Sequence, residues 1–126
     1  MNVFSDFYSR LQSAQRAGLP CVGLPWSHKI YRFGLLLKRL KYIEDLECID
    51  DSEKKSCTIW FYLKPGSFSY LRQISKPSLR VYKKAKEIHP YKKAYGSLIL
   101  STSKGLLSCQ EAQALGLGGE LMCEIY

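Results

Sequence analysis

The stretch Leu98-Ile99-Leu100-Ser101-Thr102-Ser103-Lys104-Gly105 decides the fold of the C-terminal half. Its three apolar residues predict a short buried strand. The polar residues after them predict a turn, because hydroxyl side chains and glycine favour turns. Ser108 and Glu111 then make an S-x-x-E capping box that opens a short helix, and Gly116 is well suited to end it.

Strands are predicted on either side of this helix and turn. Residues 68–74 and 121–126 are short runs of β-forming side chains. Pro65-Gly66 is a strong punctuation signal, and we place the boundary between two lobes there. The predicted lobes are residues 1–64 and residues 65–126.

The N-terminal lobe is predicted to mix helices and strands. Apolar residues recur at helical spacing over 2–16 and again after Ser27, which resembles an N-cap. The proline-bounded stretch 20–25 predicts an edge strand, because proline cannot donate to a central ladder. Residues 43–48 and 57–63 predict a hairpin. The fold class is therefore α+β: an N-terminal α/β lobe packed against a C-terminal, mainly β lobe with one short helix.

The charge of the chain predicts a polyanionic partner. The 126 residues carry 19 Lys and Arg against 11 Asp and Glu, a net charge of +8. Residues 76–93 hold seven basic side chains, one acid and two tyrosines, and residues 24–43 hold five basic side chains and no acid. Basic side chains with interleaved aromatics are typical of RNA-binding surfaces, although a solvated basic face is the plain alternative.

Other functional classes find little support in the sequence. The five cysteines form no C-x-x-C pair and lie far from His28 and His89, which argues against a disulfide scaffold and a metal site and for a reducing compartment. No apolar run reaches the ~20 residues of a membrane span, and no signal peptide is visible. Ser101 and Lys104 match S-x-x-K, but its companion motifs are missing. We therefore expect no enzyme activity, cofactor, small-molecule substrate or membrane partner.

The polar turn suits RNA better than catalysis. Residues 101–105 offer three hydroxyls, one ammonium and a glycine. The wide, shallow minor groove of an RNA helix displays 2′-hydroxyls and base edges, and hydroxyl side chains can meet these as donors or acceptors. An ordinary capped turn is the alternative on chemistry alone.

Three motifs in the C-terminal half resemble those of the small-subunit ribosomal protein eight family of bacteria and organelles. Leu100-Ser101-Thr102-Ser103-Lys104-Gly105 matches its Ser-Thr-Ser-Lys-Gly motif, and Gly116-Leu117-Gly118-Gly119-Glu120 follows at the family's spacing. Ile74-Ser75-Lys76-Pro77-Ser78-Leu79-Arg80-Val81-Tyr82 is similar to its Ser-Arg-Pro-Gly-x-Arg-x-Tyr segment. The N-terminal half agrees more weakly, and Lys41 stands where the family commonly has glycine.

The resemblance implies a structural protein that binds the central domain of small-subunit ribosomal RNA, supports its assembly and meets neighbouring ribosomal proteins. A free-standing RNA-binding translational regulator is the alternative. The resemblance assigns the following residues to RNA contact or to its support: Ser101, Thr102, Ser103, Lys104, Gly105, Lys76, Arg80, Tyr82, Gly118, Gly119 and Glu120, with Arg10, Ser27 and Lys29 on a second RNA segment.

The compartment is predicted from the departure of this sequence from the bacterial pattern of the family. Many Tyr and Cys residues, and a start directly at the family's first helix, suggest an organelle-encoded protein of mitochondrial ribosomes. Bacterial cytoplasm and plastid are the alternatives.

Overall fold

The computed structural model describes residues 3–51, 56–76, 79–84 and 97–126. Within it the chain forms two compact units, Met1–Ser69 and Tyr70–Tyr126. Each unit combines helix with antiparallel sheet, so the predicted α+β class is confirmed. Most of the predicted basic stretch lies outside the described residues, which include Lys76, Arg80, Lys83 and Lys84 from it.

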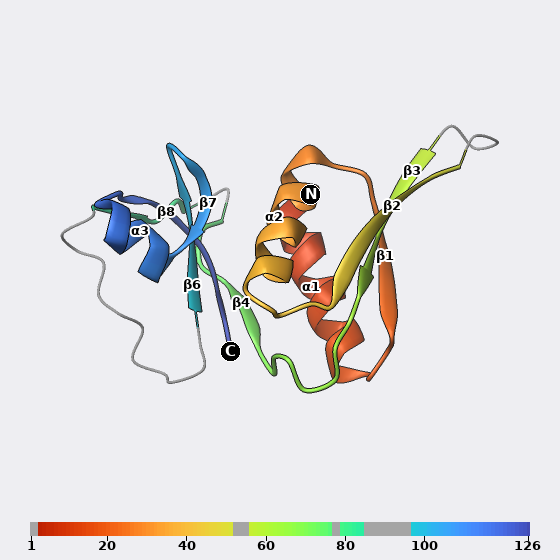
Figure 1. Cartoon of the computed structure of the whole chain (residues 1–126). Helices are drawn as coiled ribbons and strands as arrows, with labels where there is room; N and C mark the ends of the chain where they lie inside the picture. The colour runs from red at the N-terminus through yellow and green to blue at the C-terminus, as the bar shows by residue number, and fades with distance from the viewer. Residues whose placement is uncertain (1–2, 52–55, 77–78, 85–96) are drawn as a thin grey trace. The chain divides into compact units, whose positions relative to one another are not determined.

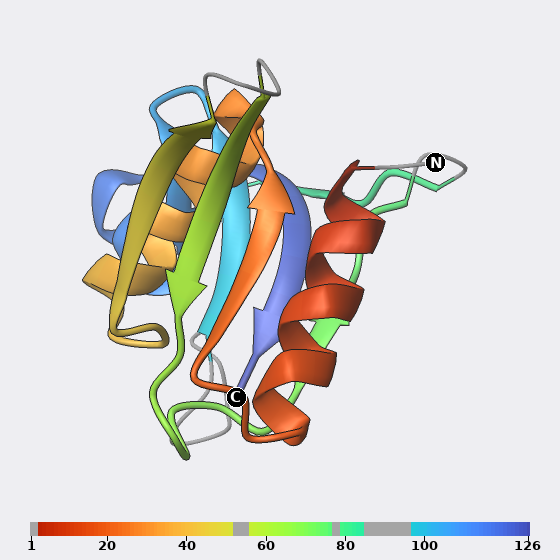
Figure 2. The ribbon, with the colours of Figure 1, turned by 90° about the vertical axis from the view of Figure 1, so that its right-hand side faces the viewer.

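The first unit is a three-stranded antiparallel sheet with two helices on one face (Figures 1 and 2). Its elements are α1 (Val3–Arg16), β1 (Cys21–Pro25), α2 (His28–Arg39), β2 (Asp45–Asp51) and β3 (Ser56–Tyr62). The strand order is β1-β3-β2, so β1 lies at an edge as its prolines predict. The predicted hairpin is confirmed as β2 and β3.

Aromatic rings hold the helices of this unit to its sheet. Phe7 of α1 contacts Phe33 of α2 at 5.2 Å and Phe61 of β3 at 5.5 Å between ring centroids. All three side chains are almost completely buried. Fully burying a side chain of this size stabilises the fold by about 1.5–3 kcal/mol. This packing holds one face of α2 in the core and leaves the opposite face exposed to solvent.

Three details of the first unit were not foreseen from the sequence. Ser27 lies at the N-cap position of α2, but its side chain makes no capping hydrogen bond. Cys48 and Cys57 are joined by a disulfide, because the β2–β3 hairpin brings together two cysteines that follow no framework spacing. Lys41 has φ of 68° and is the one non-glycine with positive φ among the described residues. It adopts the backbone conformation that favours the family's glycine.

The second unit is built around the strand β8. Its elements are β4 (Leu71–Gln73), β5 (Tyr82–Lys83), β6 (Ser97–Thr102), β7 (Gly105–Ser108), α3 (Cys109–Leu115) and β8 (Gly119–Ile125). The strand order is β4-β8-β6-β7, and β5 also pairs with β8 (Figure 1). The strands β6 and β8 were predicted from the sequence. The strand predicted over residues 68–74 is confirmed as β4 but is shorter, and β5 and β7 were not predicted.

Helix α3 covers one face of this sheet. Cys109 and Ala112 of α3 pack with Leu100 of β6, and all three are buried. The Glu111 amide donates to Ser108 Oγ at 3.3 Å, and the Ser108 amide donates to Glu111 Oε1 at 3.2 Å. The predicted capping box is therefore confirmed, and Gly116 ends the helix in the left-handed conformation. Across the described part of the chain, no helix is long and apolar enough to cross a membrane.

Candidate nucleic-acid interface

The Ser-Thr-Ser-Lys-Gly segment forms the tip of the β6–β7 hairpin. Thr102 pairs with Gly105, while Ser103 and Lys104 make the turn between them with exposed side chains. Gly105 has φ of 99°, a backbone conformation that disfavours any residue with a Cβ. A positive-φ glycine directly after such a turn is typical of hairpins that close with a bulge. The tip therefore presents one hydroxyl and one ammonium to solvent.

Thr102 has a different task from its neighbours in the motif. Its Oγ1 donates to the Gly105 carbonyl at 2.8 Å and accepts from the Lys104 amide at 3.2 Å. The one proton of this hydroxyl is thus used inside the turn. Thr102 therefore stabilises the turn, and the side chains of Ser103 and Lys104 remain exposed to solvent.

Next to the hairpin tip, three side chains lie in a row across neighbouring strands of the sheet: Ser101, Glu120 and Tyr82. Glu120 of β8 lies opposite Tyr82 of β5 on one side and opposite Ser101 of β6 on the other. Directly opposed residues of a sheet point to the same face. Tyr82 is 66% exposed, so its ring is available to a partner on that face. The sheet register brings together motifs that are about twenty residues apart in the sequence.

Arg80 neutralises the carboxylate in the middle of this row. Its Nη1 lies 2.9 Å from Glu120 Oε1. The hydrogen bond that this guanidinium donates to the carboxylate raises the pKa of Arg80 above its ordinary value, so the group stays cationic. Glu120 is the less exposed partner, with 14% of its side chain accessible against 51% for Arg80. A bare carboxylate here would repel phosphate, and the ion pair removes that repulsion.

Gly119 allows β8 to approach β6 at the motif. A Cβ at this position would stand 2.2 Å from the Ser101 carbonyl oxygen and 2.9 Å from the Ser101 carbonyl carbon. Real side chains do not tolerate such a separation, and the obstacle is backbone that cannot rotate away. Gly119 therefore supports the site without contributing a contacting group. It is the first residue of β8, and Gly118 directly precedes it.

Ser75 is a buried polar residue that the sequence analysis did not assign to the site. It is 5% exposed, and its Oγ accepts from the Val81 amide at 2.9 Å and donates to the Val81 carbonyl at 3.3 Å. The Val81 carbonyl also accepts from the Leu121 amide at 2.8 Å. Ser75 therefore fastens the segment that carries Arg80 and Tyr82 to β8. Nothing local in the sequence marks this role, because β8 lies far along the chain.

We expect Ser75→Ala to loosen this segment. The Val81 amide would lose its partner, at a cost of about 1–3 kcal/mol if it stays buried. Hydrogen exchange of the Val81 amide, followed by NMR, should quicken, and Ser75→Thr should restore most of the protection. Unchanged exchange of this amide in Ser75→Ala would show that the hydroxyl does not hold the segment.

Lys76 and Leu79 form an isolated antiparallel β-bridge within the same segment. The amide of each donates to the carbonyl of the other, at 2.9 and 3.0 Å. Lys76 is exposed, as are Lys83 and Lys84. The second unit thus joins these predicted residues in one connected structure: Ser101, Thr102, Ser103, Lys104, Gly105, Lys76, Arg80, Tyr82, Gly118, Gly119 and Glu120.

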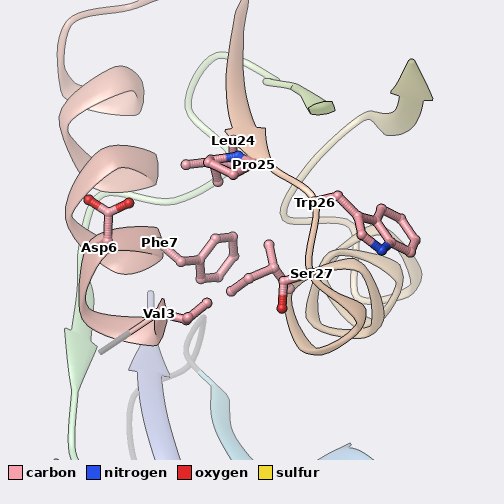
Figure 3. Close-up of a pocket in the computed structure, with 8 residues that line it drawn as sticks. Val3, Asp6, Phe7, Leu24, Pro25, Trp26 and Ser27 are labelled. Atoms are coloured by element: carbon pink, nitrogen blue, oxygen red, sulfur yellow. The ribbon is translucent and has the colours of Figure 1, made fainter. Parts of the chain in front are cut away.

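The other three predicted residues belong to the first unit. Arg10 lies 3.1 Å from Asp6 one turn earlier in α1, and Lys29 is exposed in the first turn of α2. Ser27 helps to line a pocket of about 140 Å³, together with Asp6 and Phe7 (Figure 3). This volume is below the roughly 300–1,000 Å³ of sites that enclose drug-sized ligands.

The model of the family described as ribosomal protein S8 matches residues 2–126. The chain belongs to the ribosomal protein S8 family. The match covers every motif of the site, including the hairpin tip, the segment of Arg80 and Tyr82, and the glycines before Glu120. The resemblance seen in the sequence is therefore confirmed.

Bacterial members of the S8 family match along nearly their whole length. The chain is 34% identical to the small ribosomal subunit protein uS8 of Sulfurimonas denitrificans, over 99% of this chain and 98% of that protein. It is 34% identical to uS8 of Campylobacter jejuni, with the same coverage. Identity to uS8 of Neisseria meningitidis serogroup C is 33%, over 94% and 92%. About two-thirds of the compared positions therefore differ between this chain and each of these relatives.

Proposed function

We propose that this chain is a structural, RNA-binding component of the small ribosomal subunit that binds the central domain of its ribosomal RNA and supports assembly. The observation that carries the proposal is the hairpin tip. Ser103 and Lys104 are exposed at its end, while Thr102, Gly105 and Gly119 are used to build it. Three motif residues therefore support the turn, and the other two, Ser103 and Lys104, are exposed to a partner. Membership of the S8 family supports the same function.

The chemistry of the tip fits the minor groove of an RNA helix. Ser103 can donate to or accept from a 2′-hydroxyl or a base edge, and Lys104 can pair with a phosphate. Tyr82 offers an exposed ring on β5, across β8 from Ser101, and aromatic rings stack on bases that leave the helix. Arg80 pairs with Glu120, so this carboxylate is not left unpaired.

The proposal also fixes which side of the second unit faces RNA. Residues 105–126 contain Glu111, Glu120 and Glu124 and no basic side chain. The exposed side of α3 carries Gln110, Gln113 and Leu115. We therefore propose that RNA approaches the tip and the Lys76–Lys84 segment, whereas α3 faces a neighbouring ribosomal protein or solvent.

We further propose that α2 binds a second RNA segment. Lys29, Arg32 and Arg39 are exposed on this helix, and no acid lies between residues 24 and 43. Arg10 and Ser27 are the other candidates. Arg10 forms an ion pair with Asp6. We therefore expect Arg10 to contribute less than Lys29 to the affinity for phosphate.

The compartment of this ribosome is proposed as mitochondrial. The chain's divergence from its bacterial relatives, which are about one-third identical to it, supports this proposal. The alternatives are the bacterial cytoplasm and the plastid. Co-sedimentation with small subunits of a purified organelle, through a high-salt gradient, tests both the compartment and residence in the ribosome. A free-standing translational regulator would stay at the top of that gradient.

The contact at the tip is tested with Ser103→Ala combined with Lys104→Ala. Loss of the hydroxyl should cost about 1 kcal/mol, or roughly fivefold in affinity. Loss of the ammonium should lower the slope of log affinity against log salt by about one unit. Ser56→Ala with Lys64→Ala makes the same chemical change at exposed positions of the first unit. Binding of both double variants within error of the parent would refute the assignment.

A further inference from the structure

An exposed tryptophan stands at the start of the basic helix α2. Trp26 is 38% exposed and immediately precedes Ser27 at the N-cap position. Its amide donates to the Cys57 carbonyl at 2.9 Å, which anchors its backbone to β3. In Figure 3 its indole points away from Phe7, which reaches into the pocket. Trp26 is one of the residues that line this pocket, and its indole lies on the side away from Phe7.

Two rings of α2 hold this indole in place. The centroid of Trp26 lies 5.3 Å from that of His28, edge to face, and 5.2 Å from that of Tyr31. Such contacts favour one orientation of an aromatic side chain over the others. The indole is thus preorganised while more than a third of the residue stays accessible.

The charges that α2 itself places beside this cluster are positive, because its first turn contains no acid. Lys29 and Arg32 are exposed on the same first turns of α2. Asp6, the acid that lines the neighbouring pocket, is paired with Arg10 at 3.1 Å. Proteins that bind single-stranded nucleic acid combine these two elements, a basic surface along the backbone and aromatic rings on which bases stack.

We propose that Trp26 is a stacking platform for an unpaired base of the RNA segment bound by α2, with Lys29 and Arg32 on the flanking phosphates. The proposal rests on the RNA-binding function proposed above and names a contact in the first unit that the Ser-Thr-Ser-Lys-Gly motif does not supply. The stacked base adds affinity but little sequence preference, because every base has a flat face.

The test uses the full chain with Trp60→Phe, which leaves Trp26 as the one tryptophan. Trp60 is a suitable residue to remove, because its indole lies across Gly23 on the sheet and not on α2. A short oligouridylate should quench Trp26 emission, whereas a blunt RNA duplex of equal length should quench it much less. Unchanged emission at saturating oligouridylate would overturn the proposal.

Substitutions separate stacking from charge. Trp26→Ala in the full chain should weaken oligouridylate binding about five- to a hundredfold without changing its salt slope, since no cation is lost. Trp26→Phe should keep most of the affinity. Arg32→Ala should lower the slope by about one unit and still permit full quenching. Affinity of Trp26→Ala within twofold of the parent, or equal weakening by Trp26→Phe and Trp26→Ala, would overturn the platform.

The two proposals can fail separately. A parent chain that binds small-subunit ribosomal RNA, and loses affinity on Ser103→Ala with Lys104→Ala, retains the proposed function even if Trp26 emission never changes. A parent chain that binds no ribosomal RNA loses the proposed function itself.

Discussion

Replacing Gly119 by alanine is expected to destabilise the second unit and to remove most of its RNA affinity. The added Cβ would stand 2.2 Å from the Ser101 carbonyl oxygen, so β8 and β6 must separate where the motif begins. Overpacking against flexible side chains costs about 1–3 kcal/mol, and a rigid backbone neighbour places this change at or above the upper end. Denaturant unfolding and RNA titration of the same preparations measure both effects.

A surface variant separates this effect from general damage. Gln113→Ala changes an exposed residue of α3 and should leave both stability and affinity within error of the parent. A folded Gly119→Ala protein with the parent's unfolding midpoint and RNA affinity would show that the close approach of β8 to β6 is not needed for the site.

Raising the salt concentration is expected to weaken RNA binding steeply. The second unit carries five described cations near the motif segments: Lys76, Arg80, Lys83, Lys84 and Lys104. If about four phosphates are neutralised, affinity should fall about a hundredfold between 50 and 200 mM salt. Each single Lys→Ala change that removes a phosphate contact should lower the slope by about one unit or somewhat less.

The same titration identifies charges that are merely solvated. Lys64→Ala removes an exposed cation outside the proposed surfaces and should leave the slope unchanged. Arg80→Ala is informative because this guanidinium is paired with Glu120, so it should change the slope less than Lys104→Ala. A flat salt dependence of the parent would show that the basic side chains do not meet phosphate.

Features set by neighbouring residues were predictable from the sequence. The capping box of Ser108 and Glu111 and the edge position of the strand with Pro25 follow from short-range rules, and both are confirmed. The turn at Ser103 and Lys104 was also predicted. The strand β7 was missed because its four residues, Gly105–Ser108, are too few to show an alternating pattern.

Features set by β8 were not predictable in this way. The role of Ser75 depends on Val81 and on the register of β8, and the ion pair of Arg80 joins residues 40 apart in sequence. The requirement for Gly119 arises only when β6 lies beside it. The motifs named these residues, but the sequence did not say that Thr102 braces the turn while Ser103 and Lys104 reach solvent.

Hydroxyl-radical footprinting of the purified chain on its small-subunit ribosomal RNA tests the central claim most directly. We expect a protected minor-groove patch in the central domain that is lost with Ser103→Ala and Lys104→Ala. We also expect a second patch that persists in this variant and weakens with Lys29→Ala. An unprotected central domain, or an undiminished first patch in the double variant, would contradict this claim.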